Sequence, residues 1–227
     1  MRRTFAALCL LLALGFASLG VWQVERRTWK LDLIARVDAR IHAAPAALPV
    51  GAAWRGDHRY RRVTVNGTYL HDRETLVQAV TERGPGWWVL TPLRTATQTL
   101  LVNRGFVPSE RRAPANRPEG QVAGPAAVTG LLRTSEPGGG FLRSNDPAAD
   151  RWYSRDVAAI ARARRIAQVA PMFLDADASA NPGGYPIGGL TVVAFSNNHL
   201  VYALTWFALA AMSLAGMIVL LRRREAR

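Results

Sequence analysis

Residues 197–206 read NNHLVYALTW and open the last long apolar run of this chain. No charged residue follows them until Arg222, so the imidazole of His199 stands at the edge of an otherwise uncharged segment. On a helix, Tyr202 and Trp206 lie three and seven positions beyond His199 and share its face. The stretch is therefore either the polar cap of a membrane helix or a place where a ligand binds, and the residues alone leave both interpretations open.

Two uncharged runs, residues 5–24 and 200–221, lie near the two ends of the chain, and a middle punctuated by Pro and Gly separates them. A helix rises about 1.5 Å per residue, so a run of about 20 residues is about 30 Å long and matches the hydrocarbon core of a bilayer. The sequence thus predicts a membrane protein in which two transmembrane α-helices flank a soluble domain at residues 25–198.

The first run also resembles a secretory signal peptide, because two arginines precede it. Signal segments have apolar cores of about 7 to 15 residues and end in small residues, whereas this run continues to Trp22 past a poor cleavage site. We therefore expect an uncleaved membrane anchor. Cys9 is the only cysteine, which excludes an intramolecular disulfide and a metal site built from several cysteines.

Basic residues flank both runs on their outer sides. Arg2 and Arg3 lie in the N-terminal residues 1–4, and four arginines lie in the C-terminal residues 222–227. The positive-inside rule then predicts that both termini are cytoplasmic and that the central domain is periplasmic. The short N-terminus lacks an Arg- and Ser-rich transit peptide, which favours the plasma (inner) membrane of a bacterium.

The chain has a formal net charge of +13, from 29 basic and 16 acidic residues. Part of the excess belongs to the terminal arginines, and the other basic residues are scattered through the middle. No extended basic face follows from this pattern, so we expect no nucleic-acid partner. Contact with membrane lipids, including anionic headgroups, agrees with the charge.

The middle of the chain predicts an α+β domain, mainly antiparallel β and barrel-like. Hydrophobic residues alternate with a period of two, and short turns separate the runs, which indicates antiparallel neighbours. A helix is expected after Ser154 as its cap, with Val157, Ile160 and Ala161 facing inward. The expected strands are residues 61–70, 75–81, 87–94, 99–107, 127–133, 168–175 and 189–196.

Motifs of catalysis are absent from the sequence. It contains no H-E-x-x-H, G-x-S-x-G or C-x-x-C pattern, and Gly138-Gly139-Gly140 matches no phosphate-binding spacing and is expected to be a mobile loop. We expect His42, His58 and His71 to be exposed to solvent, and the acid pairs around Glu74 and Asp175 to be ordinary turn residues. The chain is therefore not expected to be an enzyme.

His199 is the strongest candidate for binding a cofactor. A neutral imidazole is a ready axial ligand of heme iron, and Tyr202 and Trp206 would lie beside it. Ala203, Ala210 and Ala211 would leave a shallow lipid-facing surface for a flat macrocycle. The alternative is an interfacial histidine that hydrogen-bonds a lipid headgroup or caps the helix together with Asn197 and Asn198.

Four stretches occur in order along the chain: LGVWQVERRTWK at 19–30, LVNRGFVP at 101–108, WYSRD at 152–156 and NHLVYALTW at 198–206. Together with the two-span layout they resemble the Surfeit-locus family of cytochrome c oxidase assembly factors. The resemblance implies a chaperone of respiratory-chain biogenesis whose partner is the oxidase catalytic subunit, with heme A synthase as a further candidate partner.

In bacterial members of that family the resemblance implies binding of heme A, with His199 as the ligand of the iron. We expect Tyr202, Trp206 and Trp22, which lies at the same membrane face, to complete the cofactor site. A membrane scaffold that holds the oxidase subunit without touching heme is the alternative function. An enzyme of heme A metabolism is disfavoured, because a synthase is expected to need more spans and paired histidines.

Overall fold

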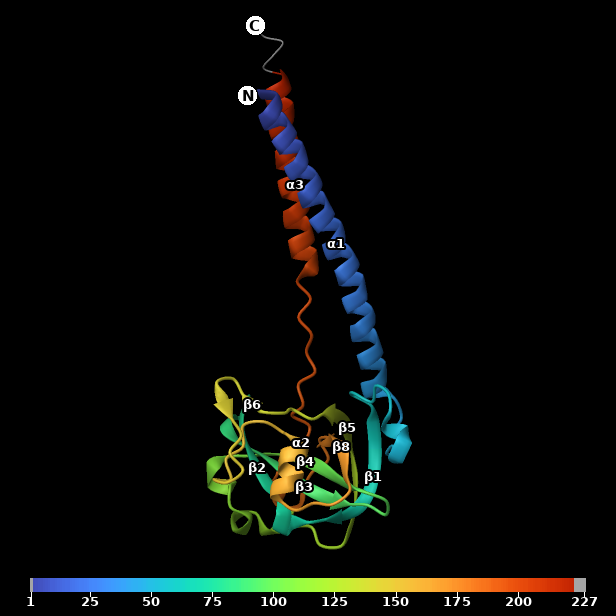
Figure 1. Ribbon diagram of the computed structural model, residues 1–227. Helices are drawn as coiled ribbons and strands as arrows, with labels where there is room; N and C mark the ends of the chain where they lie inside the picture. The colour runs from blue at the N-terminus through green and yellow to red at the C-terminus, as the bar shows by residue number, and fades with distance from the viewer. Residues whose placement is uncertain (1, 223–227) are drawn as a thin grey trace. The chain divides into compact units, whose positions relative to one another are not determined.

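The computed structural model describes residues 2–222 and divides into two compact units (Figure 1). One unit contains α1 (Arg2–His42) up to Asp38 and α3 (His199–Arg222), and the other is Ala39–Val192. Within residues 2–222, these two helices are long and apolar enough to cross a membrane. The expected fold class, two apolar helices around a soluble domain, is confirmed; Met1 and the arginines at 223, 224 and 227 lie outside the described residues.

Small residues line the contact between α1 and α3, which we call the helix pair. Ala6, Ala13 and Gly20 are buried at heptad spacing on α1, and Ala203 and Ala210 are buried at the same spacing on α3. Inside a bilayer the hydrophobic effect does not drive helices together. They associate through close packing of their backbones, which small residues permit. A Cβ added at Gly20 would lie 2.6 Å from the Phe207 ring, so a larger residue there would have to displace that ring.

The other unit, which we call the sheet unit, is built on a six-stranded sheet in the order β1-β5-β8-β4-β3-β2. An extra pairing of β1 with β3, through Thr68 with Arg94 and Tyr69 with Leu93, closes the sheet into a barrel. Most neighbours are antiparallel, as expected, but β4 and β8 are parallel. The strands are β1 (Arg62–Tyr69), β2 (Thr75–Thr81), β3 (Gly84–Arg94), β4 (Thr99–Val107), β5 (Pro125–Thr134) and β8 (Val169–Ala176).

Strand β4 is buried along its whole length, because both faces of the sheet are covered there. Leu100 and Val102 point into the barrel core, whereas Leu101 belongs to a second cluster beneath α2 (Val157–Ala163). The helix buries Val157, Ile160 and Ala161, as the sequence predicts. Two hydrophobic clusters therefore hold the sheet unit together from opposite sides of one strand.

Three local expectations are wrong. Asp156 caps α2 by accepting from the Ala159 N–H at 3.0 Å, while the Ser154 hydroxyl donates instead to the Glu136 carbonyl. No strand forms within residues 189–196. The expected glycine loop is a small hairpin of β6 (Gly139–Gly140) and β7 (Arg143–Ser144), and Gly138 and Gly139 take positive φ angles where the chain enters it.

Short 3-10 helices occupy several of the connections. Proline opens three of them, where its fixed φ angle suits the first helical position. They are Gly51–Trp54, His71–Arg73, Ser109–Arg111, Pro114–Asn116, Pro118–Gly120 and Pro182–Gly184.

Candidate functional site

His199, the first residue of α3, is hydrogen-bonded to α1. Its Nδ1 lies 2.7 Å from Oε1 of Gln23. A carbonyl oxygen only accepts, so Nδ1 is the donor in this pair. In the tautomer that this bond favours, the lone pair lies on Nε2, which is the nitrogen that can bind a metal.

The aromatic residues expected around His199 have different environments. Trp206 stacks on Phe16 of α1, with ring centroids 5.7 Å apart and an interplanar angle of 24°. Tyr202 and Trp22 are 54% and 53% exposed on the surface of the helix pair. Trp206 therefore supports the helix contact, whereas Tyr202 and Trp22 are available to a ligand.

Gln23 is the residue that the sequence analysis missed. It follows Trp22 directly in the first of the four motifs, but its partner His199 is 176 positions away in the chain. The sequence did contain a signal for this contact, because Gln23 is an uncharged polar residue near the end of an apolar run. Such groups in a bilayer usually hydrogen-bond to a neighbouring helix.

The shallow alanine surface expected on α3 is not open. Ala203 and Ala210 are only 2% and 7% exposed, because they form the close contact with α1. Ala211 remains exposed. These small residues pack the two helices together. The expectation that they form an open surface for a macrocycle is therefore wrong.

The start of α3 gives little support to the capping interpretation of His199. The Asn198 backbone carbonyl accepts from the Tyr202 N–H at 3.3 Å, as in an ordinary first turn. Within residues 2–222, the buried Asn197 Oδ1 has no hydrogen-bond partner. The imidazole is directed to Gln23 on the other helix instead of to its own backbone.

The motif in β4 has a structural role. Asn103 Nδ2 donates to Asp175 Oδ1 at 2.8 Å, and Asn103 Oδ1 accepts from the Gly105 N–H at 3.3 Å. Gly105 has φ of +133°, and a Cβ there would lie 2.1 Å from the Ile187 carbonyl oxygen. These residues join β4 to β8 and to the chain around Ile187, so they help to hold the barrel together.

Asp175 and Glu74 are buried in ion pairs, so the expectation of ordinary turn carboxylates is wrong for both. Asp175 accepts from Arg133 at 2.9 Å and from Arg155 at 3.3 Å. Glu74 pairs with Arg117, and both side chains are nearly inaccessible. Each carboxylate faces at least one guanidinium, so both acids have a charged partner inside the sheet unit.

Arg155 also binds Glu136, with Nε 3.0 Å from Oε2. Burial alone would raise the pKa of Glu136, but the hydrogen bonds from Arg155 outweigh it, and the net pKa is lowered. This carboxylate therefore remains ionised and acts as a partner of Arg155, not as a general acid.

His71 is half-buried rather than exposed, which corrects another expectation. Its Nε2 donates to the Val122 carbonyl at 3.0 Å. Burial lowers the pKa of His71, although the hydrogen bond to Val122 acts in the opposite direction. The neutral ring is thus part of the packing beneath the loop that carries Val122.

Within residues 2–222, no group of three or more His, Cys, Asp or Glu side chains could hold a metal ion.

Comparison with known proteins agrees with the four motifs. A model described as the SURF1 family matches residues 10–211. The chain is 40% identical to a SURF1-like protein of Monosiga brevicollis, over 91% of this chain and 83% of that protein. It is 37% identical to human Surfeit locus protein 1 (89% and 72% covered) and 39% identical to the mouse protein (85% and 68%).

Proposed function

This chain belongs to the SURF1 family, and from that premise we propose that it is a non-enzymatic assembly factor of cytochrome c oxidase that binds heme A through His199. The observation that carries the cofactor assignment is the hydrogen bond between His199 Nδ1 and Gln23 Oε1. An outer-sphere acceptor on one ring nitrogen orients the imidazole and makes the other nitrogen a better ligand. Nε2 of His199 is thus the proposed donor.

The surface of the helix pair fits a lipid-soluble macrocycle. Leu200, Val201 and Leu204 at the start of α3 are between 48% and 64% exposed, and Tyr202 lies among them. Heme A supplies an iron that takes axial nitrogen ligands and a farnesyl tail that partitions into lipid. Tyr202 and Trp22 would flank the cofactor with amphipathic rings suited to the membrane interface, while Trp206 keeps the two helices together.

The role we propose is binding and delivery without turnover. In the sheet unit, Glu74, Glu136 and Asp175 form ion pairs with arginines, which gives these carboxylates a structural role. The proposed partners are the oxidase catalytic subunit, heme A synthase and membrane lipids. The location we propose is an inner membrane, with two passes and the sheet unit on the outer side; the relatives compared above are eukaryotic, so the bacterial source stays a prediction.

Heme binding is tested on protein purified from cells that make heme A. We expect a Soret band that disappears in His199→Ala and is absent from protein made without heme A synthase. His58→Ala is the matched control, because His58 lies in the sheet unit and bonds only locally to the Ala53 carbonyl at 2.8 Å. An unchanged band in His199→Ala would overturn the ligand assignment.

The same hydrogen bond also suits the alternative function, a scaffold that never touches heme. A polar bond between two membrane helices contributes to their association, and His199 and Gln23 could serve that purpose alone. The two functions differ in the cell. Normal heme content of the oxidase in a His199→Ala strain would support the scaffold, whereas loss of heme from the oxidase supports delivery.

A further inference from the structure

Four apolar side chains of the sheet unit project almost fully into solvent. Phe141 is 92% exposed, Leu142 89%, Val80 87% and Val192 81%. In the same unit, which is described throughout, the next most exposed large apolar side chain, Val50, reaches only 48%. Scattered exposure of this kind is ordinary on protein surfaces, but complete exposure of several large side chains at one place marks a contact surface.

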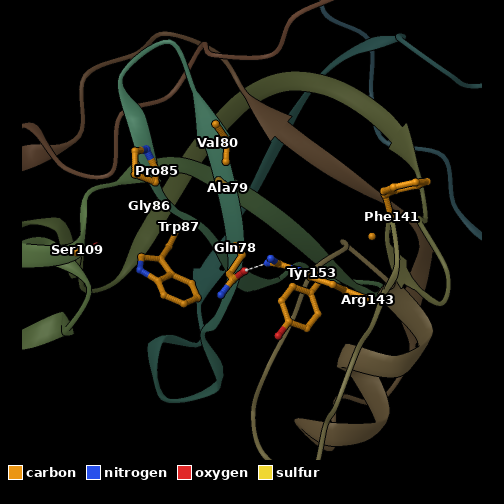
Figure 2. A pocket seen from close by; sticks show the side chains of 11 residues that line it. Gln78, Ala79, Val80, Pro85, Gly86, Trp87, Ser109, Phe141, Arg143 and Tyr153 are labelled. Atoms are coloured by element: carbon orange, nitrogen blue, oxygen red, sulfur yellow. Dashed lines mark hydrogen bonds between the residues drawn. The ribbon is translucent and has the colours of Figure 1, made fainter.

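The four residues gather at one edge of the unit, which we call the apolar edge. Val80 and Phe141 line the same cavity of about 560 Å³, and Figure 2 shows Phe141 on the opposite side of it from Pro85 and Trp87. Val80 and Val192 line a second cavity of about 300 Å³. Val80 lines both cavities and so lies between the hairpin tip at Phe141 and the end of the unit at Val192.

The hairpin tip is an unusual place for two large apolar residues. Phe141 and Leu142 form the turn between β6 and β7, where Gly, Asn and Asp are favoured. Leu142 even adopts a φ of +56°, which is unfavourable for a side chain of this type. Neither side chain packs into the domain, so folding of the sheet unit does not explain the choice of residues.

The position of Val192 in the chain indicates what covers the edge. Val192 is the last residue of the sheet unit, and only residues 193–198 separate it from His199, where α3 begins. The seven residue-to-residue steps from Val192 to His199 span at most about 25 Å when the chain is fully extended. Since α3 is long and apolar enough to cross a bilayer, Val192 is tethered within this distance of the start of a helix that can enter lipid.

We propose that the apolar edge inserts into the interfacial region of the bilayer. Neighbouring side chains suit that environment. Trp87 and Tyr153 line the cavity beside the edge and have the amphipathic rings found at membrane interfaces. Arg143 and Arg83 are exposed beside it and can reach lipid phosphates, with Glu82 as the acidic neighbour.

Contact with lipid at this edge does not depend on heme binding by His199, and it is tested separately. The full chain with Cys9→Ser is given a single nitroxide at Phe141→Cys or at Val80→Cys and is placed in phosphatidylcholine liposomes containing phosphatidylglycerol. Collisions with oxygen, which concentrates in lipid, are compared with collisions with a water-soluble nickel chelate. Thr97→Cys is the matched control, because Thr97 is exposed and lies in the turn at the opposite end of β3 from Pro85.

Nitroxides at positions 80 and 141 are expected to collide severalfold more with oxygen, relative to the chelate, than the nitroxide at position 97. Equal chelate access at all three positions would overturn the proposal. Protection of position 141 from both reagents would also overturn it, since it would show a protein contact between copies of the chain. A normal Soret band in the labelled proteins would show that the cofactor site is intact whichever result is obtained.

Discussion

The helix pair and the sheet unit use their polar residues in opposite ways. In the sheet unit, the motif around Asn103 and Gly105 is buried, and its groups are bonded to Asp175 and the neighbouring chain. In the helix pair, His199 and Gln23 form one polar link on a surface of exposed apolar side chains. The difference teaches that a recognisable motif does not by itself mark a ligand site: one motif here holds a barrel together, and the other links two membrane helices through His199, the residue for which we propose a ligand.

Gly105→Ala should have the largest effect on the sheet unit. A Cβ at this position would lie 2.1 Å from the Ile187 carbonyl oxygen on a backbone with φ of +133°. We expect a loss of more than about 3 kcal/mol in the free energy of unfolding, measured by denaturant titration of the purified chain in detergent. Gly84→Ala is the control, because φ is also positive (+91°) but no described atom lies within 4 Å, and about 1 to 2 kcal/mol is expected. Equal losses would contradict the role assigned to the close approach.

Asp175→Asn should be the next most damaging change. It would leave Arg133 and Arg155 without their shared carboxylate, and the Asp175 side chain is only 2% exposed. Removing one member of a buried ion pair costs about 3 to 5 kcal/mol. Asp146→Asn, which breaks an exposed pair with Arg151, should leave the denaturation midpoint unchanged. A small effect at Asp175 would mean that the buried network is dispensable.

Gly20→Leu should act on the helix pair and spare the sheet unit. The new side chain would collide with Phe207, and overpacking of this kind costs about 1 to 3 kcal/mol. A disulfide between Cys9 and a cysteine at Gly216→Cys reports the contact, because a Cβ at 216 lies 4.0 Å from Cys9 Sγ. We expect Gly20→Leu to reduce the crosslink and Gly15→Leu, which meets no described atom within 4 Å, to preserve it. An unaffected crosslink in Gly20→Leu would contradict the close contact.

The smallest expected effect is the pH dependence contributed by His71. Burial lowers its pKa in the folded state below the ordinary value of 6.5, so the folded state favours the neutral ring. Its contribution to stability is complete above pH 6.5 and is lost as the pH falls through the folded pKa. Glu136, whose pKa is lowered from 4.5, responds only at more acidic pH. Thermal unfolding between pH 7 and 5 should therefore vary less in His71→Gln than in the wild type, and identical slopes would contradict this.

Much of the local structure of the sheet unit follows from the sequence. Periodicity and turn residues located β1 to β5 and β8 to within about three residues. Strands β1, β2 and β5 alternate between buried and more exposed residues, whereas β4 is buried on both faces and was recognised from its apolar run and the turn before it. The parallel pairing of β4 with β8 did not follow, since it joins segments about 70 positions apart and local periodicity has no information about it. The segment at 189–196 has strand-like residues but does not form a strand.

The helix pair was predictable in its elements and not in its contacts. Length and hydropathy located both helices, and the edge position of His199 singled it out. The heptad spacing of Ala203 and Ala210 is typical of a helix-packing surface. It does not identify the partner surface, because the buried residues of α1 lie far away in the sequence. For the same reason no local pattern linked Gln23 to His199.

The most direct test of cofactor binding is an optical titration of the purified full chain with heme A, comparing wild type, Gln23→Leu and His199→Ala. If His199 Nε2 binds the iron and Gln23 positions the ring, the Soret shift is lost in His199→Ala and occurs in Gln23→Leu with affinity reduced about 10- to 100-fold. Equal binding by all three proteins would contradict the assignment of His199 as the heme ligand.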